Sequence, residues 1–291
     1  MRRPAARAPS LERSTHTDRS IAGCKEISNF REHDYGGPVF AMVVRRFGRT
    51  VEATATYVRD ESDWRRLRGR CQVSPGRRIS PVRREGSVQR SRVELRRRCL
   101  ALGADHMWTF TRRGRFESRE DALAAFARFE RLYGRVLGPY VAVIEPHQVG
   151  GFHIHVAVRG FKPVHAVRSC WSRALGGTGL ERGADTLGNV DVSDRRGRSV
   201  RATASYLAKY LGKCVDVASG RKLFSASKGL TPSSVRRFVV PLTVGAPGQD
   251  RARYVLEQLY LRDFESSAVW WCGGIEGFTC WAEDMAPSGS G

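Results

Sequence analysis

Two histidines alternate with apolar residues in the segment GGFHIHVAVRG, residues 150–160. In an extended strand successive side chains point to opposite faces, so His153 and His155 are expected side by side, with Phe152 and Ile154 on the other face. Neutral imidazole is a common metal ligand, and two imidazoles on one strand face can bind the same ion. The pattern predicts a metal site; the alternative is two histidines on the polar face of a half-exposed sheet.

A third ligand for such an ion comes from the residues just before the histidines. The segment Tyr140–Glu145, YVAVIE, is apolar and rich in β-branched residues, and PHQVGG after it contains the Pro and Gly typical of a hairpin turn. Antiparallel pairing would bring Glu145 near the histidines. His147 is a reserve ligand, because its position in the turn leaves the direction of its side chain open.

A second group of chemically useful residues occupies RSVRATASYLAKYLGK, residues 198–213. On a helix, Tyr206 and Tyr210 lie one turn apart, and Lys209 and Lys213 share their stripe. The tyrosine spacing by itself is also typical of core packing. The lysines favour a stripe that faces anionic groups, because an unpaired ammonium is costly to bury. The chain has only six lysines, and four of them lie in this segment or within the fifteen residues after it: Lys209, Lys213, Lys222 and Lys228.

The elements that must position these residues are predicted from the patterns around them. Ser118 and Asp121 form a capping box that begins a helix carrying apolar residues at helical spacing. The full order is a strand at 106–113, a helix at 118–138, a hairpin at 140–158, a helix at 163–175, a short strand at 189–194 and the tyrosine helix. This order predicts an α+β sandwich with a central antiparallel sheet flanked by helices.

The charge of the chain limits its partners. The 291 residues include 50 Lys and Arg against 29 Asp and Glu, a formal net charge of +21, with 41% hydrophobic residues. This excess favours a polyanion such as nucleic acid; an anionic membrane surface is the weaker alternative, because no long apolar run is present. Seven cysteines without C-x-x-C spacing argue against a disulfide framework and a structural zinc site. The first residues carry no apolar signal segment, so a cytoplasmic location is expected.

Charge also divides the chain into three expected regions. Residues 1–100 are rich in arginine and are interpreted either as a partly disordered basic arm or as a DNA-contacting subdomain, with two short helices near 60–70 and 88–102. Residues 101–240 are expected to form the folded domain that holds the histidines and tyrosines. Residues 241–291 are expected to form a C-terminal extension that ends in a flexible tail.

Three motifs in a fixed order carry a resemblance to a known family. WTFTRR, EPHQVGGFHIHVAV and YLAKYLGK together resemble the motifs of the HUH endonucleases, specifically the rolling-circle replication initiators (Rep proteins) of plasmids and single-stranded DNA phages. The resemblance covers roughly residues 100–230 and implies an RRM-like or ferredoxin-like sandwich. It implies that His153 and His155 bind a divalent metal, with Glu145 as a less secure third ligand. The Y-x-x-K-Y pattern implies a nucleophilic tyrosine, Tyr210 first and Tyr206 second.

The implied activity is that of a metal-dependent, site-specific DNA endonuclease and strand transferase. Mg²⁺ or Mn²⁺ is expected, because a metal on the scissile phosphate neutralises its charge. Free tyrosine has a pKa of about 10, so Lys209 and Lys213 would favour the phenolate or hold the phosphate. Attack would leave a 5′-phosphotyrosine link and a 3′-hydroxyl that primes replication, and a later 3′-hydroxyl would rejoin the strand.

The expected partners follow from this activity. The substrate would be single-stranded or extruded origin DNA, contacted by the loop SGRKLFSASKG through Lys222, Phe224 and Lys228, for which a solvated surface turn is the alternative. No G-x-x-x-x-G-K-[ST] sequence occurs, so a host helicase and polymerase of a bacterial cell are expected to cooperate. A transposase of the same superfamily keeps the same motif order and is the nearest alternative enzyme. A non-catalytic basic DNA-binding protein is the alternative from another class.

Overall fold

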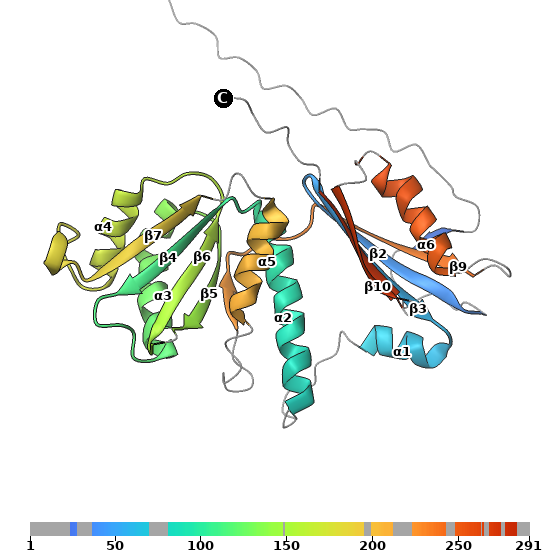
Figure 1. The fold of residues 1–291 in the computed structure, drawn as a ribbon, viewed down its shortest axis with the longest axis horizontal. Coiled ribbons are helices and arrows are strands. Elements are labelled where there is room, and N and C mark those ends of the chain that lie inside the picture. The colour runs from blue at the N-terminus through green and yellow to red at the C-terminus, as the bar shows by residue number, and fades with distance from the viewer. Residues whose placement is uncertain are drawn as a thin grey trace, which may run out of the picture.

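The computed structural model describes residues 24–27, 37–69, 81–147, 149–194, 199–211, 223–242, 248–262, 264, 268–274 and 277–283. Within these residues the strands form two antiparallel sheets, each covered by helices (Figure 1). The predicted α+β fold with an antiparallel sheet flanked by helices is confirmed. None of the described helices combines the length and the apolar character needed to cross a membrane.

The first sheet contains the histidine segment at its centre. Its strand order is β7-β4-β6-β5-β8. The bounds are β4 His106–Arg112, β5 Tyr140–Pro146, β6 Phe152–Val158, β7 Gly188–Asp194 and β8 Phe224–Ala226. The predicted strands and the hairpin of the central region are therefore confirmed to within a few residues.

Helices cover both faces of this first sheet. The helices are α2 Pro81–Leu102, α3 Arg119–Leu137, α4 Val164–Ala174 and α5 Val200–Tyr210. Helices α3 and α4 pack on one face around an aromatic cluster, in which the rings of Phe110 and Trp171 lie 5.0 Å apart. Helices α2 and α5 pack on the other face, where Leu95 and Leu207 are fully buried. The strand residues alternate between these two cores, which is the period of two that fixes their directions.

Side-chain caps begin two of these helices as the sequence favours. The Ser118 hydroxyl accepts a hydrogen bond from the backbone N–H of Asp121 at 3.0 Å and starts α3. The Ser199 hydroxyl does the same for the N–H of Ala202 and starts α5. Each cap satisfies a backbone donor that a helix start leaves unpaired, and so fixes where the helix begins.

The second sheet joins the two ends of the chain. Its order is β1-β9-β2-β3-β11-β10, with strands from both the first sixty residues and the region beyond residue 233. The bounds are β1 Lys25–Ile27, β2 Val39–Phe47, β3 Thr50–Val58, β9 Ser234–Pro241, β10 Val269–Gly274 and β11 Gly277–Glu283, with α1 Glu61–Gly69, α6 Gly248–Leu256 and a π-helical turn Glu257–Leu261. Helix α6 covers one face, and Trp64 of α1 is buried against the other.

This sheet differs from the expected division of the chain. The N-terminal region was expected to be a basic arm or a subdomain with two helices, but β2 and β3 also lie there and pair with β9 and β11. The expected boundary at residue 240 falls inside β9. The helix expected near 60–70 is α1, and the one expected at 88–102 begins earlier, at Pro81. Strand β3, TVEATATYV, contains no arginine and is rich in β-branched residues, so its local signal was outweighed by the arginine clusters elsewhere in the region. The predicted flexible tail lies outside the described residues.

Helices α2 and α5 stand between the two sheets (Figure 1). From the second sheet, the buried Glu52 accepts hydrogen bonds from Arg97 of α2 at 2.5 and 2.7 Å. The Glu283 carboxylate accepts from the backbone N–H of Val200 at 2.9 Å, in the first turn of α5. The guanidinium of Arg201 lies 4.9 Å from the ring centres of both Trp270 and Trp281. The start of α5 is thus held by the second sheet.

Replacing Arg201 with alanine is expected to lower the free energy of unfolding by about 1–2 kcal/mol, because it removes a cation placed over two indole rings. Urea unfolding followed by tryptophan fluorescence measures the change. Arg131→Ala removes an exposed arginine of α3 and is the matched control, with an expected change below about 0.5 kcal/mol. Equal losses in the two variants would contradict a specific role for this stack.

Candidate active site

The register of the central hairpin places the candidate ligands. Glu145 of β5 lies directly opposite His153 of β6, and Thr109 of β4 lies directly opposite His155. The turn needs glycine at Gly151, whose φ is +80° and where a Cβ would lie 2.8 Å from the Cβ of Arg115. This turn fixes the register, and a slip of one residue would move both histidines to the opposite face.

A buried pair joins Glu145 to His155. The imidazole Nε2 and the carboxylate Oε2 are 2.6 Å apart, and the two residues are only 6% and 8% exposed. The hydroxyl of Thr109 lies 3.1 Å from Nδ1 of the same ring. With its proton on Nε2, the His155 imidazole donates a hydrogen bond to the Glu145 carboxylate and accepts one at Nδ1 from the Thr109 hydroxyl. The hydrogen-bonding groups of all three side chains then have a partner. These contacts fix the orientation of the His155 ring.

Two further imidazoles, those of His153 and His147, continue from His155 toward the hairpin turn. The ring centres of His153 and His155 are 6.4 Å apart, and those of His147 and His153 are 4.5 Å apart. Burial lowers the pKa of His153 below its ordinary 6.5, and the neighbouring His147 lowers it further, while Glu145 opposes the shift. The shift favours the neutral imidazole, which is the form that binds a metal through its lone pair.

Helix α5 brings both tyrosines to the histidines. The rings of Tyr210 and His155 are stacked, with centres 4.0 Å apart and an angle of 5° between the planes. The Tyr206 ring meets Tyr210 edge-on at 5.3 Å and is 39% exposed. The spacing of the two tyrosines is also typical of core packing. Tyr206 is too exposed to be a core residue, so core packing does not account for both side chains. The structure thus brings together five of the sequence-predicted residues: Glu145, His153, His155, Tyr206 and Tyr210.

The remaining predicted residues are distributed differently. Lys209 is exposed on α5 and Lys228 is exposed in the turn after β8, whereas Lys213 and Lys222 lie outside the described residues. Phe224 was expected to contact DNA by stacking. It lies in β8 instead, opposite Val143 of β5, and packs partly buried against the core below α2 and α5. Its ring is therefore covered in part by the protein and exposed in part, and its contact with DNA stays a prediction.

The donor set can be tested against a divalent ion. In the described part of the chain, no group of three or more His, Cys, Asp or Glu side chains is arranged to hold a metal ion. The carboxylate and the His155 ring are hydrogen-bonded to each other, and coordination through Nε2 requires loss of the proton between them. One carboxylate and two imidazoles on adjacent strands nevertheless form a mixed oxygen and nitrogen donor set, which suits Mn²⁺ better than Mg²⁺ because Mg²⁺ prefers oxygen ligands. The residues fit the ion by type, and their side chains would have to converge on it.

Sequence reasoning missed Thr109 and the arginines of α2. Thr109 carries a detectable signal, because it shares the strand face of the histidines in the alternation of WTFTRR. The abundance of arginine near α2 is visible in the sequence, but the position of these arginines beside α5 is not, because it depends on tertiary packing. Comparisons of the chain with protein families, with curated proteins and with solved structures find no match.

The His153 imidazole is expected to titrate below pH 6.5 in metal-free protein, and His147→Ala is expected to move its pKa upward, because the variant removes a neighbouring positive charge as the pair protonates. Two-dimensional NMR of the histidine ring protons measures both values. The exposed His165 of α4 serves as an internal reference. An unchanged His153 titration in His147→Ala would contradict this coupling.

Proposed function

We propose that this chain is a metal-dependent tyrosine endonuclease and strand transferase of the Rep type, which nicks one DNA strand at a replication origin. The observation that carries the proposal is the stacking of Tyr210 on His155, the ring paired with Glu145. A candidate nucleophile and candidate metal ligands, far apart in the sequence, share one face of the sheet. A protein that only binds DNA has no need of this arrangement.

The reaction requires few groups. The Tyr210 oxygen would attack the phosphorus, forming a Tyr–O–P bond as the P–O3′ bond breaks, while the phenolic proton passes to solvent and the 3′-oxygen gains a proton. Because the link conserves the phosphodiester, a later 3′-hydroxyl would displace the tyrosine without ATP. His153, His155 and Glu145 would hold Mg²⁺ or Mn²⁺, which when bound polarises and neutralises the scissile phosphate.

The other residues of α5 support this role. Tyr206 is exposed beside Tyr210 and would serve a second transfer within the same site. Lys209 is exposed on the same helix, and the net charge of +21 favours a polyanionic substrate. Single-stranded or extruded origin DNA is the proposed substrate, with strand separation by a host helicase and synthesis by a host polymerase in a bacterial cytoplasm.

Tyr210→Phe is expected to abolish, or transfer to Tyr206, a covalent protein–DNA adduct that wild type forms with single-stranded DNA and Mn²⁺, because the phenylalanine lacks the attacking oxygen. Denaturing gel electrophoresis of labelled DNA detects the adduct, and the Tyr206→Phe/Tyr210→Phe double variant is expected to form none. Tyr254→Phe, at an exposed tyrosine of α6, is the matched control and keeps the adduct. An adduct of undiminished yield in the double variant would overturn the proposed chemistry.

His153→Ala is expected to weaken Mn²⁺ binding by about tenfold or more, since it removes an imidazole that would bind the ion directly. Electron paramagnetic resonance of free Mn²⁺ in titrations without DNA measures the affinity independently of nicking. The control is His165→Ala on α4, which is expected to bind Mn²⁺ like wild type. Equal affinities in all three proteins would place any bound metal elsewhere.

A further inference from the structure

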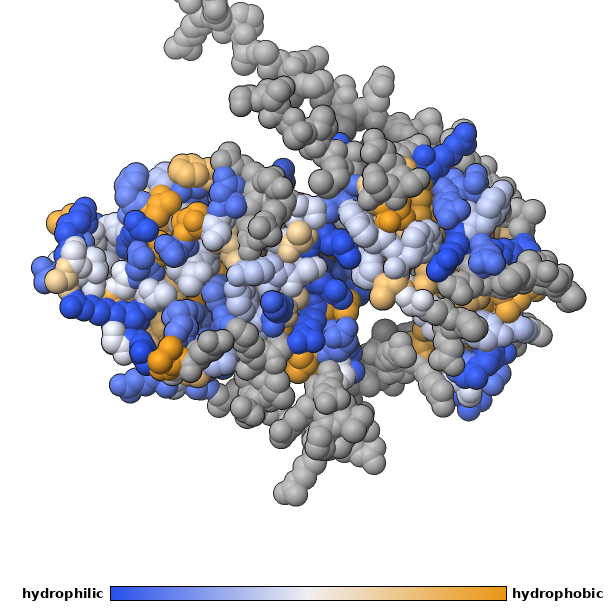
Figure 2. Space-filling model, viewed as in Figure 1, coloured by the Kyte–Doolittle hydropathy of each residue, from blue (hydrophilic) through white to orange (hydrophobic). Residues whose placement is uncertain are grey.

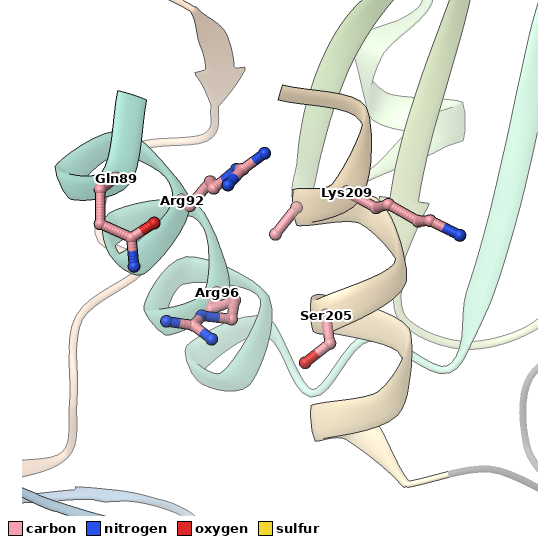
Figure 3. Close-up of a pocket in the computed structure, with 6 residues that line it drawn as sticks. Gln89, Arg92, Arg96, Ser205 and Lys209 are labelled. Carbon is pink, nitrogen blue, oxygen red and sulfur yellow. The ribbon is translucent and has the colours of Figure 1, made fainter. Parts of the chain in front are cut away.

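A basic groove runs between helices α2 and α5, beside the tyrosines. Its volume is about 380 Å³, and its lining residues are Gln89, Arg92, Arg96, Ser205, Ala208 and Lys209 (Figure 3). Figure 3 shows Arg92 reaching from α2 into the gap and Ser205 facing it from α5, while the Lys209 ammonium extends away from α2. Strongly hydrophilic residues gather over this middle part of the molecule (Figure 2).

The groove has a positive charge that no residue of its lining compensates. Its lining contains the guanidinium groups of Arg92 and Arg96 and no carboxylate, and Lys209 lines it while its ammonium extends away from α2. Other arginines of α2 are paired, Arg97 with Glu52 and Arg98 with Glu94. Among the residues that the structure describes, Arg92 and Arg96 form no such ion pair, and the buried Nε of Arg92 has no hydrogen-bond partner. A buried donor without a partner is costly, so a ligand that accepts from it would be stabilised.

The electrostatics of Arg96 agree with this interpretation. Burial lowers the pKa of Arg96, Glu52 opposes the shift, and Arg201, Arg97 and Arg92 lower it again by repulsion. Several guanidinium groups therefore crowd one small region from α2 and α5. An anion between the helices would relieve this repulsion, and the planar guanidinium fork matches phosphate oxygens especially well.

We propose that the α2–α5 groove binds backbone phosphates of the single DNA strand whose neighbouring nucleotide reacts with the tyrosines. This inference rests on the proposed function and adds the path of the strand. Ser205 and Lys209 of the groove precede Tyr206 and Tyr210 in the chain, so the groove adjoins the tyrosine stripe along the same helix. The lining has no aromatic or large apolar side chain on which a base could stack, so the contacts recognise the phosphodiester and not the base sequence.

The test is the binding of labelled oligothymidylate by fluorescence anisotropy, without metal, over a series of KCl concentrations. All proteins carry Tyr206→Phe/Tyr210→Phe, so that no covalent link contributes. Adding Arg92→Gln/Arg96→Gln is expected to weaken binding about tenfold and to reduce the slope of log K against log [KCl] by about 1.4, or about 0.7 for each lost phosphate contact. Circular dichroism establishes that each variant is folded.

The matched control is Arg131→Gln/Arg135→Gln, which removes the same two charges from exposed positions on α3, over the opposite face of the first sheet. This control is expected to keep the salt slope within about 0.3 of the parent. Ser205→Glu, at an exposed position of the groove, is a second test that leaves the arginines in place and is expected to weaken binding as strongly. Equal slopes for the groove variants and the control would overturn the proposal.

The two proposals fail separately. If wild type forms no covalent adduct but the groove variants lose affinity and slope, the groove binds phosphate and the tyrosine chemistry is wrong. If wild type forms the adduct and the groove variants bind like the control, the tyrosine chemistry stands and the strand follows another path.

Discussion

The buried hydrogen bond between Glu145 and His155 is the contact on which the candidate site depends. A carboxylate so little exposed is stable only with a partner, and the imidazole and the Thr109 hydroxyl complete one connected set of bonds. The bond joins neighbouring strands and fixes the plane of the His155 ring. Tyr210 stacks on that ring, so the candidate nucleophile is in direct contact with the pair that would bind the metal.

The second sheet also holds helix α5, through contacts at the start of the helix. Glu283 accepts from the first turn of the helix and the Arg201 guanidinium lies over two tryptophan rings, while Glu52 holds α2 through Arg97. The helix that carries the tyrosines is therefore held at its start by one sheet and along its length by the other. Any change that shifts the two sheets relative to each other would change the position of Tyr210.

Local pattern predicted much of the first sheet and little of the second. The alternation around His153, the hairpin glycines and the cap at Ser118 are local signals, and the structure follows them. The pairing of β2 with β9 and of β3 with β11 joins segments that lie about two thirds to four fifths of the chain apart, and no local period specifies such partners. Phe224 was assigned to a basic loop because of its neighbours, but burial against the α2–α5 core determines its place.

The three faces of α5 explain how one short helix can have several roles. Residues advance about 100° per step, so Ala204 and Leu207 face the core, Tyr206 and Tyr210 face the histidines, and Ser205 and Lys209 border the basic groove. The core face keeps the helix in place, which lets the other two faces carry exposed and charged groups. Because the tyrosine and groove faces are adjacent, a strand held by its phosphates on one face would have the reacting nucleotide beside the other. The proposed anion groove and the candidate nucleophile are thus related by helical geometry, and a change on either face can be made without disturbing the buried one.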